Sequence, residues 1–146
     1  MDNVGILVEA LGRELPVERL IVDPDVLASF SHDDAEWAPV GRAAVCVRAR
    51  SEAEVQHVVR TCAELRTAVV PRGAGTGLSG GANAVGGCVI LDLSQMNRIV
   101  EIDPDNLLAV VQPGAINSDV KAAAAEHGLW YPPDPASATS STIGGK

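Results

Sequence analysis

Residues 71–87 read PRGAGTGLSGGANAVGG, and this stretch holds seven of the chain's 14 glycines. Glycine costs backbone entropy on folding, so chains concentrate it where the main chain takes positive φ or lies against a bulky group. A loop of successive amide groups without intervening side chains forms a concave anion site that suits phosphate. Apolar runs flank the stretch on both sides. A pyrophosphate cradle between two buried strands is therefore favoured over a flexible surface loop, with Thr76 and Ser79 adding hydroxyl hydrogen bonds.

Two better-known phosphate motifs do not fit this stretch. Residues 75–80 match G-x-G-x-x-G, but a dinucleotide fingerprint needs glycines that open a helix. Here three further glycines follow and the next predicted element is a strand. The P-loop also fails, because the Gly-Gly-Lys of residues 144–146 has serine at position 140 and no following Ser or Thr.

The composition limits the classes of partner. The chain has 146 residues, enough for one domain with a modest core or for half of a larger unit. Its net charge of −8 and its four aromatic residues argue against nucleic acid, which requires a basic surface or a stacking platform. No apolar run is long enough to span a membrane. The first residues lack the basic region of a secretion signal.

The cysteines point to a reducing compartment. Cys46, Cys62 and Cys88 are odd in number and form no C-x-x-C pair. This pattern favours buried free thiols over a disulfide or a zinc site. We therefore expect a cytoplasmic protein without a metal ion.

Local signals predict the elements before the glycine-rich stretch. Helical spacing of apolar residues predicts a helix from Val4 to Leu11 that ends at Gly12. Asp23-Pro24 caps a second helix through Phe30, and residues 32–41 are predicted as a loop.

A predicted strand–helix–strand unit then leads into the glycines. The strands cover residues 43–47 and 68–70, and Ser51 with Glu54 forms a capping box for the helix between them. Residues 88–93 form a third strand. Short connections through a helix predict a right-handed crossover with parallel strands. On the helix, the residues expected to face the core are Val55, Val58, Val59 and Cys62.

The pattern changes after this unit. Residues 98–103 and 107–112 flank Pro104-Asp105-Asn106 and predict a hairpin with a type I turn. A helix from about Ser118 to His127 ends at Gly128, and no regular element is predicted after it. The fold class is therefore α+β (α/β-like): a small parallel βαβ subdomain followed by the start of an antiparallel subdomain. Residues 1–40 form a helical and loop segment, and residues 41–146 form the domain proper.

Five ordered motifs resemble the FAD-binding domain of the FAD-linked oxidases. The branch is that of D-lactate dehydrogenase and the glycolate oxidase flavin subunit, within the vanillyl-alcohol-oxidase or PCMH-type superfamily. The resemblance begins at about residue 23 and covers only the opening part of such an enzyme, so it implies an incomplete PCMH-type FAD-binding fold. The motifs are PRGAGTGLSGG (71–81), VILDLSQM (89–96), QPG (112–114), YPPDP (131–135) and STIGG (141–145).

The resemblance implies FAD as cofactor and assigns roles within these motifs. The loop amides from Gly73 to Ser79 would hold the pyrophosphate, while Arg72 orders the loop. Pro133, Asp134 and residues 141–145 would approach the ribityl chain and the flavin ring, where small residues let the backbone lie close. The residues implied to bind the cofactor are Arg72, Gly73, Ala74, Gly75, Thr76, Gly77, Leu78, Ser79, Pro133, Asp134, Ser141, Thr142, Ile143, Gly144 and Gly145.

Two departures from the family pattern qualify the assignment. Members that attach FAD covalently through this loop carry His where this chain has Thr76, so noncovalent FAD is implied. The family continues its TIGG run with Asn and a further glycine-rich segment, whereas this chain has Lys146. The substrate domain and the catalytic residues are therefore expected to be absent, and no catalytic residue can be assigned.

The implied activity is that of an FAD-dependent 2-hydroxy-acid dehydrogenase or oxidase of the D-lactate or glycolate type, with hydride transfer to flavin N5. The chain alone is expected to be inactive and to bind FAD weakly. One alternative is a stand-alone binding module that needs a second chain to complete the flavin site, which leaves open a homo- or hetero-oligomer. A carbohydrate oxidase of the same superfamily fits the loop but fits less well the segments at 91–96 and 131–135.

The remaining polar and aromatic residues give weaker signals. His57 is expected to be solvated, and His127 to play a structural part in a last helical turn. His32, beside two aspartates in a loop, is a minor site candidate. Asp92 is expected to cap the turn after its strand. Trp130 and Tyr131 fit either a flavin border or a packing plug.

Overall fold

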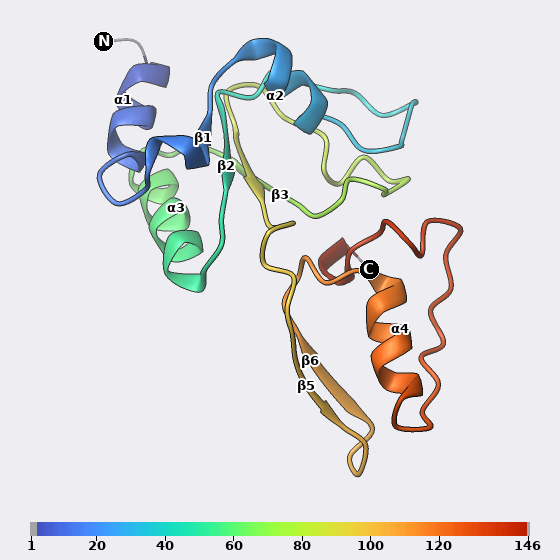
Figure 1. Ribbon diagram of the computed structural model, residues 1–146. Coiled ribbons are helices and arrows are strands. Elements are labelled where there is room, and N and C mark those ends of the chain that lie inside the picture. The colour runs from blue at the N-terminus through green and yellow to red at the C-terminus, as the bar shows by residue number, and fades with distance from the viewer. Residues whose placement is uncertain (1–2, 146) are drawn as a thin grey trace.

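The computed structural model describes residues 3–145 and consists of a sheet flanked by helices, followed by a hairpin and a last helix (Figure 1). In chain order the elements are α1 (Asn3–Leu11), η1 (Val17–Arg19), β1 (Leu20–Ile21), α2 (Pro24–Phe30), β2 (Val45–Arg48), α3 (Glu52–Glu64), β3 (Val69–Arg72), β4 (Val89–Asp92), β5 (Ile99–Asp103), β6 (Leu108–Val111), α4 (Asn117–Ala125) and η2 (Ile143–Gly145). The mixed α+β architecture confirms the predicted fold class.

The main sheet has the strand order β1-β2-β4-β3. Both β2 and β3 run parallel to β4, so the predicted parallel crossover is confirmed, with β4 inserted between the two strands that α3 connects. β1 pairs antiparallel with β2 and was not predicted from the sequence. Because the three parallel strands end at one edge, the glycine-rich stretch leaves the carboxyl end of β3 at that edge.

Helices cover both faces of this sheet. The central strand β4 is buried throughout its length, as expected for a strand covered on two sides. Helices α1 and α3 cover one face, and α2 covers the other (Figure 1). The core on the α1–α3 side contains Leu7, Leu11, Leu15, Val45, Val47, Ala49, Val58, Cys62, Val89, Leu91 and Met96. The core on the α2 side contains Leu27, Ala43, Cys46, Val70, Ala84, Cys88 and Ile90.

Helix α3 begins at the predicted cap. The Ser51 hydroxyl accepts a hydrogen bond from the Glu54 amide at 3.3 Å, and the Glu54 carboxylate accepts from the Arg50 amide at 2.6 Å. The predicted core face is wrong at Val59, which is 47% exposed. Thr61 is buried in its place, because the stripe that faces the sheet runs through Val58, Thr61 and Cys62.

The expectation that His57 is solvated is also wrong. Its Nε2 lies 3.0 Å from the Leu11 carbonyl oxygen, and its Nδ1 lies 3.5 Å from the Glu14 carboxylate. Its side chain is only 12% exposed. His57 therefore joins α3 to the carboxyl end of α1, where the Leu11 carbonyl also accepts from the Leu15 amide at 3.3 Å.

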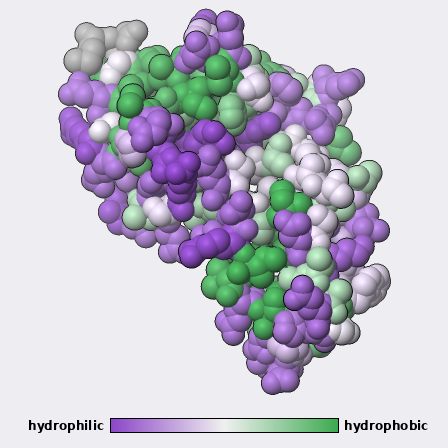
Figure 2. Space-filling view, viewed as in Figure 1, coloured by the Kyte–Doolittle hydropathy of each residue, from purple (hydrophilic) through white to green (hydrophobic). Residues whose placement is uncertain are grey.

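The second part begins with the predicted hairpin. Strands β5 and β6 pair antiparallel, with an irregular register between Ile99 and Glu101. The Asp103 carboxylate accepts hydrogen bonds from the backbone and side-chain N–H groups of Asn106, and these bonds lower the pKa of Asp103. Figure 2 shows an apolar area over this hairpin, where Leu108 and Val110 are 60% and 51% exposed.

Helix α4 is capped by the tail and not by a side chain. The Asn117 amide donates to the Ser141 carbonyl at 2.9 Å, and the Ser118 amide donates to the Ala138 carbonyl at 3.0 Å. The tail also forms a bridge between Ile116 and Thr142 and ends in η2, although no element was predicted there. The helix ends before Gly128, which has φ +69° as its predicted role requires, and His127 lies exposed beyond the last turn.

The three cysteines are free and buried, as predicted. Burial, with a smaller contribution from the nearby Asp92 carboxylate, raises the pKa of Cys46 to about 12, and burial raises the pKa of Cys62 to about 11. They are therefore thiols at neutral pH and not nucleophiles. In residues 3–145, no helix has the length and apolar character of a membrane span, and no three His, Cys, Asp or Glu side chains are grouped to hold a metal ion.

Candidate functional site

A cleft with a volume of about 780 Å³ lies between the glycine-rich loop and the tail. One wall is the continuous stretch from Pro71 to Ser79, which follows β3. The opposite wall comes from the tail. Its lining residues are Pro135, Ala136, Ser137, Ser141, Thr142, Gly144 and Gly145, and Pro113, which precedes α4, lies against Gly144. The cleft thus brings together residues that are about 70 positions apart in the chain.

The amide groups of the loop have the property that a phosphate cradle requires. Among residues 3–145, none of the five successive amides from Gly75 to Ser79 has a hydrogen-bond acceptor. The preceding amide, that of Ala74, donates to Thr142 Oγ1 at 3.2 Å. Since all five residues line the cleft, their donors remain available to an anion in it.

Glycine is required at two positions of this wall. Gly75 has φ +76°, and a Cβ there would overlap the Arg72 guanidinium. A Cβ at Gly73 would overlap Thr142 Oγ1, so this glycine allows the tail to lie directly against the loop. The two glycines therefore serve close packing of the cleft walls as well as backbone conformation.

The Arg72 guanidinium lies against Gly75 and supports the loop. It donates to the His32 carbonyl and lies 6.0 Å from the centre of the Phe30 ring. This placement agrees with the expected ordering role of Arg72. His32 contributes its carbonyl group, while its exposed ring lies 3.1 Å from the neighbouring Asp33 carbonyl.

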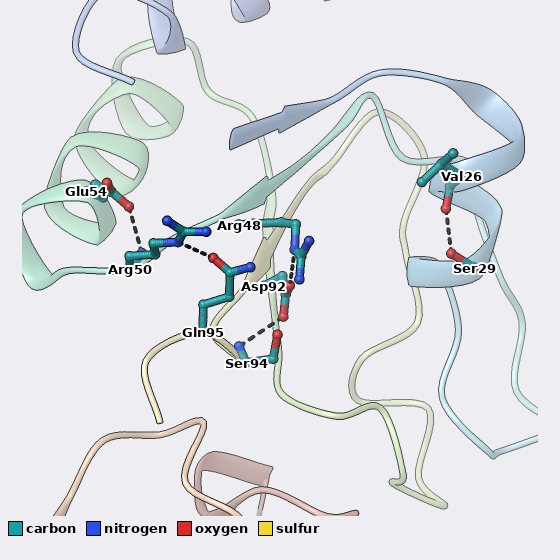
Figure 3. A network of polar contacts seen from close by, with 8 residues as sticks. All are labelled: Val26, Ser29, Arg48, Arg50, Glu54, Asp92, Ser94 and Gln95. Atoms are coloured by element: carbon teal, nitrogen blue, oxygen red, sulfur yellow. Dashed lines mark hydrogen bonds and ion pairs between the residues drawn. The ribbon is translucent and has the colours of Figure 1, made fainter. Parts of the chain in front are cut away.

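The strand ends beside the loop are held by a polar network (Figure 3). Asp92, which is 1% exposed, accepts from Arg48 Nε at 3.2 Å and from the Ser94 amide at 3.0 Å. The predicted turn-capping role of Asp92 is therefore confirmed. Arg50 donates to Gln95 in the same region, so the connection that follows β4 is fixed to the end of β2.

Three residues predicted for the cofactor site do not line the cleft. The Pro133 carbonyl accepts from Asn117 Nδ2 at 3.2 Å, and Asp134 pairs with Lys121 at 2.9 Å, so both face α4. Ile143 donates its amide to the Ala115 carbonyl at 2.9 Å. The structure gives these three residues a part in holding the tail.

Ten residues of the cleft lining were given no cofactor role from the sequence: Asp33, Asp34, Pro71, Gly81, Ala82, Leu93, Pro113, Pro135, Ala136 and Ser137. The QPG motif of residues 112–114 pointed to Pro113, but no role was assigned to it. The two aspartates were noted only as neighbours of His32. Trp130 is 78% exposed, so the packing-plug interpretation is wrong for this residue.

The residues present fit a diphosphate-containing cofactor. The loop offers successive amides that have no acceptor in the described range, and Gly75 and Gly77 let its backbone approach a ligand closely. Such a loop at the carboxyl edge of parallel strands is typical of domains that bind a nucleotide cofactor. Comparison with known proteins makes the class more specific.

The sequence model of the FAD binding domain family matches residues 43–146. The chain belongs to this family, whose cofactor is FAD. It is 38% identical to D-lactate dehydrogenase of Anaerostipes hadrus over 91% of this chain and 28% of that protein. It is 46% identical to glycolate oxidase subunit GlcD of Bacillus subtilis over 87% of this chain and 25% of that protein. The chain therefore spans about a quarter of the length of these curated relatives.

Solved structures show the same fold. An alkyldihydroxyacetonephosphate synthase matches with a TM-score of 0.84 at 20% identity, over 97% of this chain and 28% of that one. p-Cresol methylhydroxylase matches with a TM-score of 0.74 at 25% identity, over 87% of this chain and 25% of that one. These neighbours confirm the PCMH-type FAD-binding fold and show that the chain corresponds to part of it.

Proposed function

We propose that this chain is the FAD-binding portion of a flavin-dependent oxidoreductase that acts on a 2-hydroxy acid of the D-lactate or glycolate type. The observation that carries the proposal is the run of five unpaired amides from Gly75 to Ser79 in the cleft wall. The similarity to D-lactate dehydrogenase and to the glycolate oxidase subunit supports the substrate class. Three buried free thiols support a cytoplasmic location.

The proposed task of this chain is to bind and orient the cofactor. When bound, FAD supplies the acceptor, flavin N5, for a hydride from the substrate α-carbon. The loop amides would hold the diphosphate, and the tail wall around Ser141 and Thr142 would place the flavin end. Thr76 stands where covalent members carry His, which supports noncovalent binding. We also propose the division into a segment of residues 1–40 and an FAD-binding portion of residues 41–146.

Titration with FAD, followed by flavin absorbance, tests the proposal. We expect saturable but weak binding, because the tail and the loop enclose the cleft only in part. We expect no turnover of D-lactate or glycolate by this chain alone. The assigned site would be refuted if the chain bound neither FAD nor ADP at millimolar concentration. Tight stoichiometric binding with turnover on D-lactate would refute the assignment of a partial unit.

A second candidate is a binding module whose flavin site is completed by another polypeptide. The observation that favours it is the β5–β6 hairpin, a two-stranded sheet with exposed apolar side chains at Val100, Leu108 and Val110. Two-stranded hairpins gain stability from further strands or a covering layer. Light scattering separates the candidates, since a module predicts a defined dimer or heteromer, and a partial unit predicts a monomer that aggregates through open strand edges.

A further inference from the structure

We infer that Asp33 and Asn83 are positioning residues that hold the glycine-rich loop in its anion-binding shape. This inference rests on the proposed function, because it concerns how the proposed FAD site is formed. Neither residue belongs to the motifs that identified the family. Both are buried, with exposed fractions of 6% and 7%.

The two residues bind each other's segments reciprocally. The Asp33 amide donates to Asn83 Oδ1 at 2.8 Å. The Asp33 carboxylate accepts from the Ala82 amide at 3.4 Å and from the Ala35 amide at 3.0 Å. Asn83 Nδ2 in turn lies 3.4 Å and 3.3 Å from the carbonyl oxygens of Ala38 and Pro39.

Backbone hydrogen bonds extend this contact along both segments. The Asp34 amide donates to the Gly77 carbonyl at 2.9 Å, and the Ala84 amide donates to the Ser31 carbonyl at 2.8 Å. We call these bonds between residues 31–41 and residues 77–84, together with those of Asp33 and Asn83, the clasp. The clasp uses the Gly77 carbonyl of the loop and the amides of Ala82 and Ala84, which follow the loop. It leaves the amides from Gly75 to Ser79 unpaired. It therefore turns the donors of the loop away from internal acceptors.

The charge of Asp33 makes a positional role distinguishable from an electrostatic one. Its carboxylate lines the cleft and pairs with no cation in the described part of the chain. A negative charge beside a diphosphate weakens binding by repulsion. Removing the charge would tighten binding if electrostatics dominated, and would weaken it if the hydrogen bonds to the loop dominated. Because the Asp33 carboxylate is buried and accepts from two backbone amides, we expect the second outcome.

Asp34 provides a matched control. It lines the same cleft and carries the same charge, but its side chain makes no hydrogen bond or ion pair with another residue of the described range. Asp34→Asn therefore removes the charge and keeps the clasp, since the clasp uses only the Asp34 amide. Asp33→Asn also removes the charge, and it places an amide NH₂ where the Ala82 amide needs an acceptor.

The experiment measures ADP affinity of the 146-residue chain by calorimetry for wild type, Asp33→Asn, Asn83→Ala and Asp34→Asn. We expect Asp33→Asn and Asn83→Ala to raise the dissociation constant at least fivefold, while Asp34→Asn leaves it equal or lowers it. Val58→Ala, in the core away from the cleft, controls for destabilisation. It should lower the unfolding temperature without changing ADP affinity, because Val58 is buried under α3.

Hydrogen exchange gives a readout that does not depend on the ligand. In Asp33→Asn and Asn83→Ala, the amides of Asp34, Ala82 and Ala84 should exchange at least tenfold faster than in wild type. In Val58→Ala, the exchange rates of these three amides relative to the other amides of the chain should match those of wild type. The inference is overturned if Asp33→Asn binds ADP as tightly as Asp34→Asn and its exchange is unchanged. If wild type does not bind ADP, the proposed function fails, and the exchange data alone decide whether Asp33 and Asn83 hold the loop.

Discussion

The contact between Gly73 and Thr142 joins the two walls of the cleft, and Gly73→Ala is expected to separate them. A Cβ at position 73 would overlap Thr142 Oγ1 and lie 3.3 Å from Thr142 Cβ. Gly73 does not have positive φ, so alanine is compatible with the backbone and the effect is steric. The tail must move, and the hydrogen bond from the Ala74 amide to Thr142 Oγ1 at 3.2 Å is lost.

The size of the effect follows from two contributions. Loss of the neutral hydrogen bond costs about 1 kcal/mol. Forcing an extra methyl group into a packed contact costs about 1–3 kcal/mol. The sum is about 2–4 kcal/mol in the free energy of unfolding, which corresponds to a fall of about 5–12 °C in Tm for a chain of this size. ADP and FAD should bind more weakly, because one wall of the cleft has moved.

Urea unfolding and ADP titration of four proteins provide the test: wild type, Gly73→Ala, Thr142→Ala and the double variant. Thr142→Ala removes the hydroxyl and loses only the hydrogen bond, at about 1 kcal/mol. The double variant should be close to Thr142→Ala, because the overlap has gone. Two results would refute this explanation. One is that Gly73→Ala lowers the free energy of unfolding by less than about 0.5 kcal/mol. The other is that the double variant is no more stable than Gly73→Ala.

Three further predictions concern other parts of the molecule. Acid precipitation of the FAD-loaded chain should release all flavin into the supernatant, because Thr76 provides no imidazole for a covalent bond; retained colour in the pellet would contradict this. Asp23→Ala should lower the free energy of unfolding by about 1 kcal/mol in urea, because its carboxylate caps two amides of α2, and it should leave ADP affinity unchanged. Cys46, Cys62 and Cys88 should react with Ellman's reagent at pH 8 only after unfolding. The pKa of Cys46 is about 12 in the folded chain against an ordinary 9.0, so the unfolded chain loses the Cys46 thiol proton at a lower pH than the folded chain does. The urea midpoint should therefore fall as pH rises from 9 towards 12.

Local signals predicted most of the elements. The caps at Asp23 and Ser51 marked the starts of α2 and α3, since each side chain accepts from amides in the first turn of its own helix. Hydrophobic runs placed β2, β3 and β4, and the turn at residues 104–106 placed the hairpin. β1 was missed because two residues carry no periodicity and are held only by pairing with β2.

The errors arise where distant residues decide the outcome. Val59 carries the right apolar character, but the way α3 packs on the sheet turns Thr61 inward instead. His57 is half-buried against the end of α1, and its partner Leu11 lies 46 positions away in the sequence. The tail looked irregular because its own hydrogen bonds form only isolated turns, and its other bonds go to distant residues at the start of α4.

The candidate site divides in the same way. The glycine-rich wall could be predicted because clustered glycines indicate positive φ or close approach of the backbone to another group. The opposite wall was predicted only through family resemblance, and Pro133, Asp134 and Ile143 turned out to hold the tail instead of lining the cleft. Asp33 could not be found, because its partner Asn83 lies 50 positions further along the chain.

The claim on which the account depends is that the amides from Gly75 to Ser79 bind a diphosphate. Amide ¹H–¹⁵N spectra of the labelled chain, titrated in parallel with ADP and with adenosine, test it directly. The account predicts downfield shifts of these five amide protons with ADP, saturating at one equivalent site, and no such shifts with adenosine. Unchanged signals from these five amides at saturating ADP, or the same shifts with adenosine, would contradict it.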